Sequence, residues 1–110
     1  MDVFPKFIIE DLEEDGICLL LGKVTYHKHL AHNIKNVKGG GGFSMDREKM
    51  EIVLFGESYD FGRASMEDLI YCVQRKRCFT SWTLVNNLSL EFRFFWKNPD
   101  GELIDLQESK

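Results

Sequence analysis

A run of four consecutive glycines, at residues 39–42, is the feature that most constrains how this chain folds. A short apolar segment at 50–55 follows the run, and Gly56 and Gly62 come soon after that segment. Glycine loses much conformational entropy on folding, so it is expected where the backbone needs a positive φ or another group approaches closely. The pattern therefore predicts a strand at 50–55 between glycine-rich turns, with main-chain N–H groups open to a ligand at that end of the sheet.

The length and composition predict one domain over residues 1–110, which needs no metal or disulfide to fold. The net charge of −4 argues against a general binder of nucleic acid or of anionic membranes. Cys18, Cys72 and Cys78 form no C-x-x-C pair and are expected as buried thiols in a reducing compartment. The start of the chain lacks the pattern of a signal peptide, and no apolar run is long enough to span a membrane. We therefore expect a cytoplasmic protein.

Hydrophobic periodicity predicts about six strands and one main helix. The nearly continuous apolar run at 17–24 is expected to be a central strand that is buried on both faces. The helix is expected at 65–77, with Ser65 as its N-cap. Further strands are expected at 6–9, 50–55, 79–85, 88–96 and 103–106, with turns at 15–16, 46–49 and 98–101. The fold class is therefore α+β, a mostly antiparallel or mixed sheet with the helix on one face.

All three histidines, His27, His29 and His32, fall in a window of six residues. The alternation of residue types after Lys23 predicts an extended chain in which His27 and His29 share a face. Residues 33–38 are expected to be a loop or a single helical turn. Three interpretations of the histidines are open: a metal site completed by Asp, Glu or Cys, a catalytic histidine, and exposed strand residues without a function. The residues taken alone favour the last of these.

Three segments of the chain resemble a known family when they are taken together. The tripeptide Glu-Asp-Gly at 14–16 leads into the apolar strand at 17–24, and Tyr26-His27 is followed by Leu30. Residues 39–64 then give a glycine-rich turn, a strand and the pattern G-x-S-x-x-[FY]-G-x-A. In these features the chain is similar to the phosphohistidine phosphatase family, also called the janus/ocnus family, over residues 14–85. The resemblance implies the fold of that family.

The resemblance also implies an activity. The family hydrolyses phosphoramidates without a metal or another cofactor, so the implied partner is a phosphorylated protein or a small phosphoramidate. His27 is implied as the general base or nucleophile. The candidate substrate-binding residues are Gly42, Ser58, Tyr59, Asp60 and Lys23. Of these, the resemblance implies Ser58 and the amides of Tyr59 and Asp60 as a phosphate cradle.

The chain departs from the family pattern at two positions where the family has a basic residue. Gly42 stands where the family has an arginine after the glycines. The family's lysine in the first strand is replaced by the run Cys18-Leu19-Leu20. Glu57 and Asp60 flank the phosphate site and repel a dianion, and the candidates for a compensating positive charge are Lys23, Lys28, Lys38 and Arg63.

A binding function fits the same residues. The glycine-rich edge, with Phe43, Tyr59 and Phe61, is expected to hold a protein segment or a small ligand if the fold carries no catalysis. Phe95 lies on the otherwise polar side of the 88–96 segment, which suggests a homodimer through the C-terminal hairpin. An enzyme needs the His27 ring to point at the amides of residues 58–60, whereas a binding domain does not.

Overall fold

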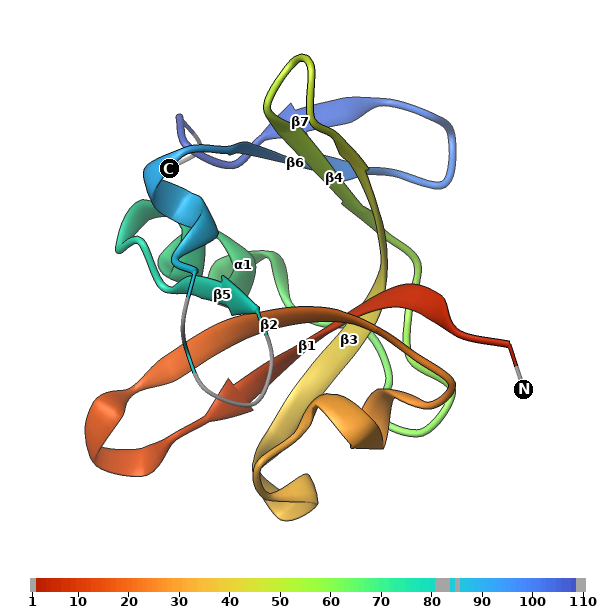
Figure 1. Ribbon diagram of the computed structural model, residues 1–110, viewed down its shortest axis with the longest axis vertical. Coiled ribbons are helices and arrows are strands. Elements are labelled where there is room, and N and C mark those ends of the chain that lie inside the picture. The colour runs from red at the N-terminus through yellow and green to blue at the C-terminus, as the bar shows by residue number, and fades with distance from the viewer. Residues whose placement is uncertain (1, 81–83, 85, 109–110) are drawn as a thin grey trace.

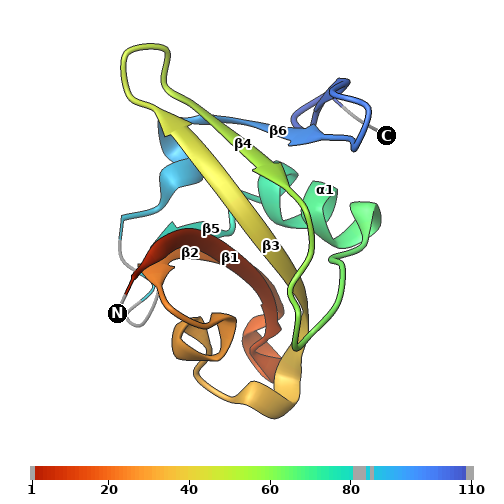
Figure 2. The same cartoon turned by 90° about the vertical axis from the view of Figure 1, so that its right-hand side faces the viewer.

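The computed structural model describes residues 2–80, 84 and 86–108, and within them the chain forms a seven-stranded mixed sheet and an α-helix. The strand order is β5-β2-β1-β3-β4-β6-β7. The elements are β1 (Phe4–Asp11), β2 (Ile17–Val24), β3 (Val37–Asp46), β4 (Glu51–Phe55), α1 (Met66–Gln74), β5 (Cys78–Thr80), β6 (Arg93–Lys97) and β7 (Leu103–Asp105). Pairing is parallel between β2 and β5 and between β4 and β6, and antiparallel elsewhere. Figures 1 and 2 show the sheet curling around α1.

The apolar run in β2 explains why this strand is central. Leu19 and Leu21 belong to the larger core cluster, which also contains the buried face of α1 and the inward side chains of β4 and β6. Cys18 and Leu20 belong to a second cluster on the other face of the sheet. The prediction of a strand at 17–24 that is buried on both faces is confirmed.

The helix begins where the sequence predicted and ends earlier. Ser65 is the N-cap, and its Oγ accepts a hydrogen bond from the Asp68 amide at 3.1 Å. The helix stops at Gln74, not at residue 77, because Lys76 adopts a left-handed φ of 57°. The amides of Lys76 and Arg77 then donate back to the carbonyls of residues 73 and 72, which is the Schellman pattern of helix termination.

The glycine run is the clearest correction. Residues 39–42 form no turn but lie inside β3, where Gly40, Gly41 and Gly42 pair with β1. A Cβ atom on Gly41 would lie 2.3 Å from the Phe55 carbonyl oxygen, and one on Gly40 would lie 2.5 Å from the Phe7 carbonyl oxygen. The glycines at these two positions therefore serve the close approach of neighbouring backbone.

The segment between β2 and β3 is also different from the expectation. The chain after Val24 is not extended but forms a 3₁₀ turn at His27–Leu30, so His27 and His29 do not share a strand face. A second 3₁₀ turn, Ile34–Asn36, is the helical turn expected within 33–38, but β3 already begins at Val37.

The C-terminal part agrees with the sequence in its turns more than in its strand lengths. The expected strand at 88–96 is replaced by a 3₁₀ turn, Leu88–Leu90, and by β6, because the Asn87 side chain accepts the Ser89 amide and starts a turn. The hairpin of β6 and β7 is confirmed, as is the 46–49 turn between β3 and β4. The strand expected at 79–85 is seen as Cys78–Thr80, and residues 81–83 and 85 lie outside the described residues. No helix among the described residues is long and apolar enough to cross a membrane.

Candidate functional site

His27 lies where β2 has ended, with its ring packed against β3. Its exposed fraction is 9%, and its Nε2 atom is 2.8 Å from the carbonyl oxygen of Gly41. A carbonyl oxygen only accepts hydrogen bonds, so Nε2 must carry the proton. In the neutral ring this leaves the lone pair on Nδ1. The strand that contains the four glycines, β3, is called the glycine strand, and its Gly41 carbonyl therefore fixes which nitrogen of the His27 ring carries the proton.

The surroundings of His27 favour the neutral ring. Burial is the main cause that lowers the pKa of His27, and it outweighs the hydrogen bond to Gly41, which acts in the opposite direction. The charge of Lys6 lowers the pKa further, and the charge of Asp60 raises it. The net effect is a pKa below the ordinary histidine value, so the Nδ1 lone pair is available at neutral pH.

His27 lines a cleft of about 470 Å³, here called the histidine cleft. Three segments that are distant in sequence form it, namely β1, the turn after β2 and the loop after β4. Its lining residues are Lys6, Thr25, Tyr26, His27, Glu57, Tyr59 and Asp60. The structure thus brings three of the predicted site residues, His27, Tyr59 and Asp60, to one place.

A second hollow adjoins this cleft along the glycine strand and is called the glycine hollow. Its volume is about 320 Å³, and it shares Lys6, His27 and Glu57 with the histidine cleft. Its other lining residues are Phe4, Pro5, Gly41, Gly42, Phe43, Phe55 and Gly56. Gly42, a candidate from the sequence, therefore lines the same hollow as His27.

The loop of residues 57–62, called the serine loop, is closed by its own hydrogen bonds. Ser58 is 1% exposed, its Oγ accepts from the Phe61 amide at 3.2 Å, and its amide donates to the Gly62 carbonyl at 3.1 Å. Ser58 does not line the histidine cleft, so its hydroxyl shapes the loop from within. Tyr59 at the tip of the loop is fully exposed.

The lysine predicted from the sequence lies elsewhere. Lys23 lines a different hollow, of about 560 Å³, together with residues of β3 such as Phe43 and Met45, and does not line the histidine cleft. The lysine beside His27 is Lys6 on β1, which the sequence reasoning missed. Lys6 pairs with Gly42 in the β1–β3 register, so a prediction of that long-range strand pairing could have placed Lys6 near the glycines.

Glu10 is a second residue that the sequence reasoning missed. Its carboxylate is 1% exposed and accepts the amides of His32 and Asn33, each at 2.8 Å, one on each oxygen. The Nδ1 atom of His32 lies 3.3 Å from the same carboxylate. Residues 27–33, called the histidine loop, are therefore tied to β1 beside His27.

The three histidines have different surroundings. His29 packs edge-on against Tyr26, with ring centroids 5.6 Å apart, and His32 pairs with Glu10. Among the described residues, no group of three or more His, Cys, Asp and Glu side chains is placed to hold a metal ion. The shared strand face on which the metal interpretation depended is not formed.

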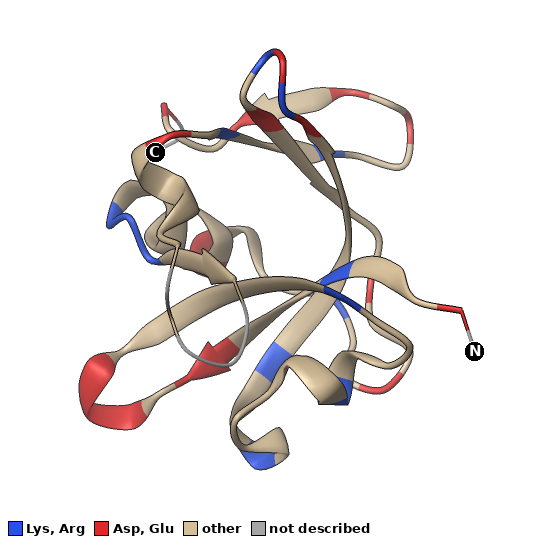
Figure 3. Cartoon of the chain, in the orientation of Figure 1, with Lys and Arg blue, Asp and Glu red and all other residues tan. Residues whose placement is uncertain are grey.

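Charge is unevenly distributed along β1 and β2. Figure 3 shows the acidic turn between these two strands at the end opposite to the 25–30 segment, and the β1–β2 register agrees with this separation. The acidic turn thus lies away from the histidine cleft. The carboxylates that line the cleft come from the serine loop instead.

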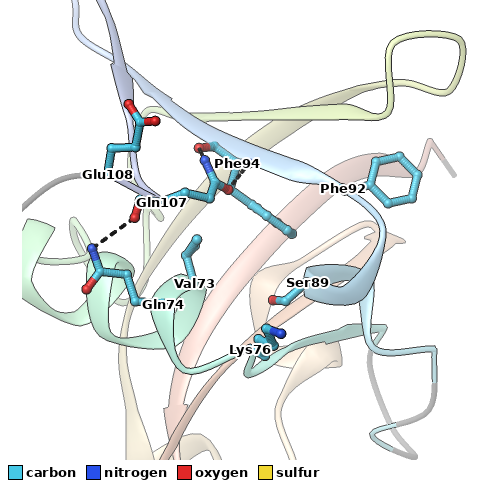
Figure 4. A pocket seen from close by; sticks show the side chains of 8 residues that line it. All are labelled: Val73, Gln74, Lys76, Ser89, Phe92, Phe94, Gln107 and Glu108. Carbon is cyan, nitrogen blue, oxygen red and sulfur yellow. Dashed lines mark hydrogen bonds between the residues drawn. The ribbon is translucent and has the colours of Figure 1, made fainter.

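A further hollow, of about 510 Å³, lies by α1 and β6 and is drawn in Figure 4. The side chain of Gln74 donates to the Gln107 carbonyl at 3.3 Å, and Gln107 also bonds the backbone of Phe94. This hollow contains none of the site residues predicted from the sequence.

A comparison of the chain with protein-family models finds no match, and a comparison with curated proteins finds none either.

Proposed function

We propose that this protein is a metal-independent hydrolase of phosphoramidates, a divergent relative of the phosphohistidine phosphatases, with His27 as its nucleophile or general base. The observation that carries the proposal is the His27 ring, nine-tenths buried and held by the Gly41 carbonyl, in one cleft with Lys6 and the serine loop. The reducing setting expected for three free, buried cysteines is consistent with a cytoplasmic enzyme.

The chemistry follows from the tautomer. As nucleophile, Nδ1 attacks phosphorus, the P–N bond breaks, and the departing nitrogen takes a proton from water. The imidazole is then cationic, and its Nε2–H donates to the Gly41 carbonyl, which stabilises that charge. Water next attacks phosphorus, its proton neutralises the hydroxide left by the first step, and the P–Nδ1 bond breaks to release phosphate and the neutral imidazole. As general base, Nδ1 instead takes the proton of the attacking water.

The phosphoryl oxygens need hydrogen-bond donors from the other residues that line the cleft. Lys6 supplies an ammonium group from β1, the strand next to the one in which the family has its lysine. The amides of Tyr59 and Asp60 are the donors that the resemblance implies, and neither donates a hydrogen bond to another described residue. The Ser58 amide does not serve, because it already donates to Gly62.

The test is phosphorus NMR of the purified protein with phosphohistidine peptide, phospholysine and phosphoramidate. We expect turnover that the His27→Ala variant loses while its amide spectrum stays folded. The matched control is His29→Ala, which removes an exposed ring from the same 3₁₀ turn and is expected to keep the activity. Absence of turnover with all three substrates, or full activity of His27→Ala, would contradict the proposal.

A binding function is the second candidate, and one observation favours it. A further hollow of about 370 Å³, the tryptophan hollow, continues from the glycine hollow through their shared Phe55, Gly56 and Glu57. Its other lining residues are Arg63, Trp96, Lys97, Asn98 and Pro99. The exposed rings of Phe4 and Phe55 offer an apolar surface for a protein segment along this edge. If this is the function, His27→Ala keeps full affinity for the segment.

The proposed homodimer depends on the C-terminal hairpin. β7 is an edge strand, and Phe95 is half-buried, with the Arg93 guanidinium carbon 5.8 Å from its ring centroid. Sedimentation equilibrium tests this proposal directly, and a strict monomer would contradict it.

A further inference from the structure

We infer that the histidine cleft selects phosphoryl groups that stand beside a cation, so that its preferred substrate is a phosphorylated histidine in a basic peptide, with an arginine or lysine side chain nearby. The inference depends on the proposed function for the presence of a phosphoryl group. It adds a requirement of its own, which comes from the charges that line the cleft.

The charges of the lining residues do not suit a phosphoryl group alone. Lys6 contributes one positive charge, whereas Glu57 and Asp60 contribute two negative ones. His27 is neutral, and among the described residues neither carboxylate has an ion-pair partner. A phosphoryl dianion would therefore add two negative charges to a cleft that is already negative. An occupant that carries its own cation removes that repulsion.

The two carboxylates stand where a cation can reach them. Both come from the serine loop, next to the fully exposed Tyr59, while Lys6 comes from β1. The phosphoryl group is therefore expected between Lys6, His27 and the main-chain amides of the serine loop, and the cation at the two carboxylates of that loop. Asp60 and His27 line the same cleft, so the two halves of the substrate are near neighbours.

Glu57 also determines where the rest of the peptide lies. It lines the histidine cleft, the glycine hollow and the tryptophan hollow, so a peptide that leaves the cleft along the glycine strand passes its carboxylate. Tyr26 also lines the cleft, and its ring already has a cation of this chain beside it, the Lys28 ammonium at 5.6 Å from the ring centroid. Lys28 itself does not line the cleft.

The experiment compares three phosphohistidine peptides of equal length, in which the residues near the phosphohistidine are arginine, alanine or aspartate. We expect kcat/KM about tenfold higher for the arginine peptide than for the alanine peptide, since two exposed charge pairs are gained, and lowest for the aspartate peptide. The preference is expected to weaken as salt is raised. In the Glu57→Gln, Asp60→Asn double variant it should largely disappear. Glu48→Gln, in the turn between β3 and β4, is the control that should retain it.

A binding measurement separates this inference from the proposed function. Amide NMR titrations use the same three peptides with a non-hydrolysable phosphonate in place of the phosphoryl group. Tighter binding of the arginine peptide without any turnover supports the charge requirement and overturns the hydrolase. Equal kcat/KM and equal affinity for the three peptides overturn the charge requirement and leave the hydrolase standing. A lack of both binding and turnover overturns both.

Discussion

Two loops face each other across the histidine cleft, and they are held in different ways. The histidine loop is fixed by contacts with distant parts of the chain: His27 bonds Gly41, Glu10 accepts two amides, and Leu30 is fully buried. The serine loop is closed by hydrogen bonds among its own residues and meets β3 where the Gly40 amide donates to Gly62 at 3.1 Å. Its tip, Tyr59, is fully exposed.

The difference suggests that the two loops have different roles in the site. A reacting group must keep its geometry, and it is best placed on a rigid element with buried supports. A loop with few buried contacts opens locally at low free-energy cost, and such loops commonly bind ligands. We therefore expect the histidine loop to be rigid before substrate binds and the serine loop to adjust to the substrate.

The largest effect on the free energy of unfolding is expected in β3, the strand against which the His27 ring packs. In Gly41→Ala, the new Cβ would meet the Phe55 carbonyl oxygen at 2.3 Å and the Phe7 ring at 2.8 Å. We expect it to lower the free energy of unfolding by about 3 kcal/mol, measured by urea denaturation. The matched change in the serine loop is Gly62→Ala, which has open space but a φ of 76° and should cost about 1 kcal/mol. Equal losses for the two variants would mean that the strand supporting His27 is no more tightly packed than the serine loop.

The next largest effect on stability is expected at Glu10 of β1, whose carboxylate holds the histidine loop. In Glu10→Gln, one oxygen becomes an amino group, so the amide of either His32 or Asn33 faces a donor. We expect a loss of about 2 kcal/mol in the free energy of unfolding, because a buried donor is left unsatisfied. Glu14→Gln, in the exposed turn between β1 and β2, is the control with little effect. A Glu10→Gln protein as stable as the control would mean that the histidine loop is not anchored by this carboxylate.

The smallest effect is expected within the serine loop. Ser58→Ala removes the acceptor for the Phe61 amide and should cost about 1 kcal/mol. Amide hydrogen exchange should rise in residues 57–62 and stay unchanged in the histidine loop. Tyr59→Ala, at the exposed tip, should leave the stability within about 0.5 kcal/mol of the original protein. Faster exchange throughout the histidine loop in Ser58→Ala would show that the two loops are coupled.

Local patterns predicted several elements of the fold well. The apolar run of β2, the Ser65 cap and the 46–49 turn depend on residues close in sequence. The glycines of β3 were misassigned because glycine indicates a special backbone need without saying which one. The clash that explains Gly41 involves Phe55 and Phe7, and neither contact is visible from the sequence.

The candidate site was predicted in part, for the same reason. Residue type and resemblance indicated His27 and the serine loop. Lys6 and Glu10 were missed because their roles depend on how β1 pairs with β3 and packs on the histidine loop, across separations of more than twenty residues. Lys23 was chosen as a candidate for a compensating positive charge, yet it lines a different hollow.

The most direct test of this account is the protonation state of the His27 ring, observed by nitrogen NMR of labelled imidazole while the pH is lowered. The account predicts a neutral ring at pH 7 with its proton on Nε2, and a pKa below the ordinary value of 6.5, since burial disfavours the cation. Gly41→Ala, where it folds, should disturb this tautomer, whereas Gly62→Ala should not. A ring with its proton on Nδ1, or one already cationic at pH 7, would contradict the account, because Nδ1 would then have no lone pair for attack.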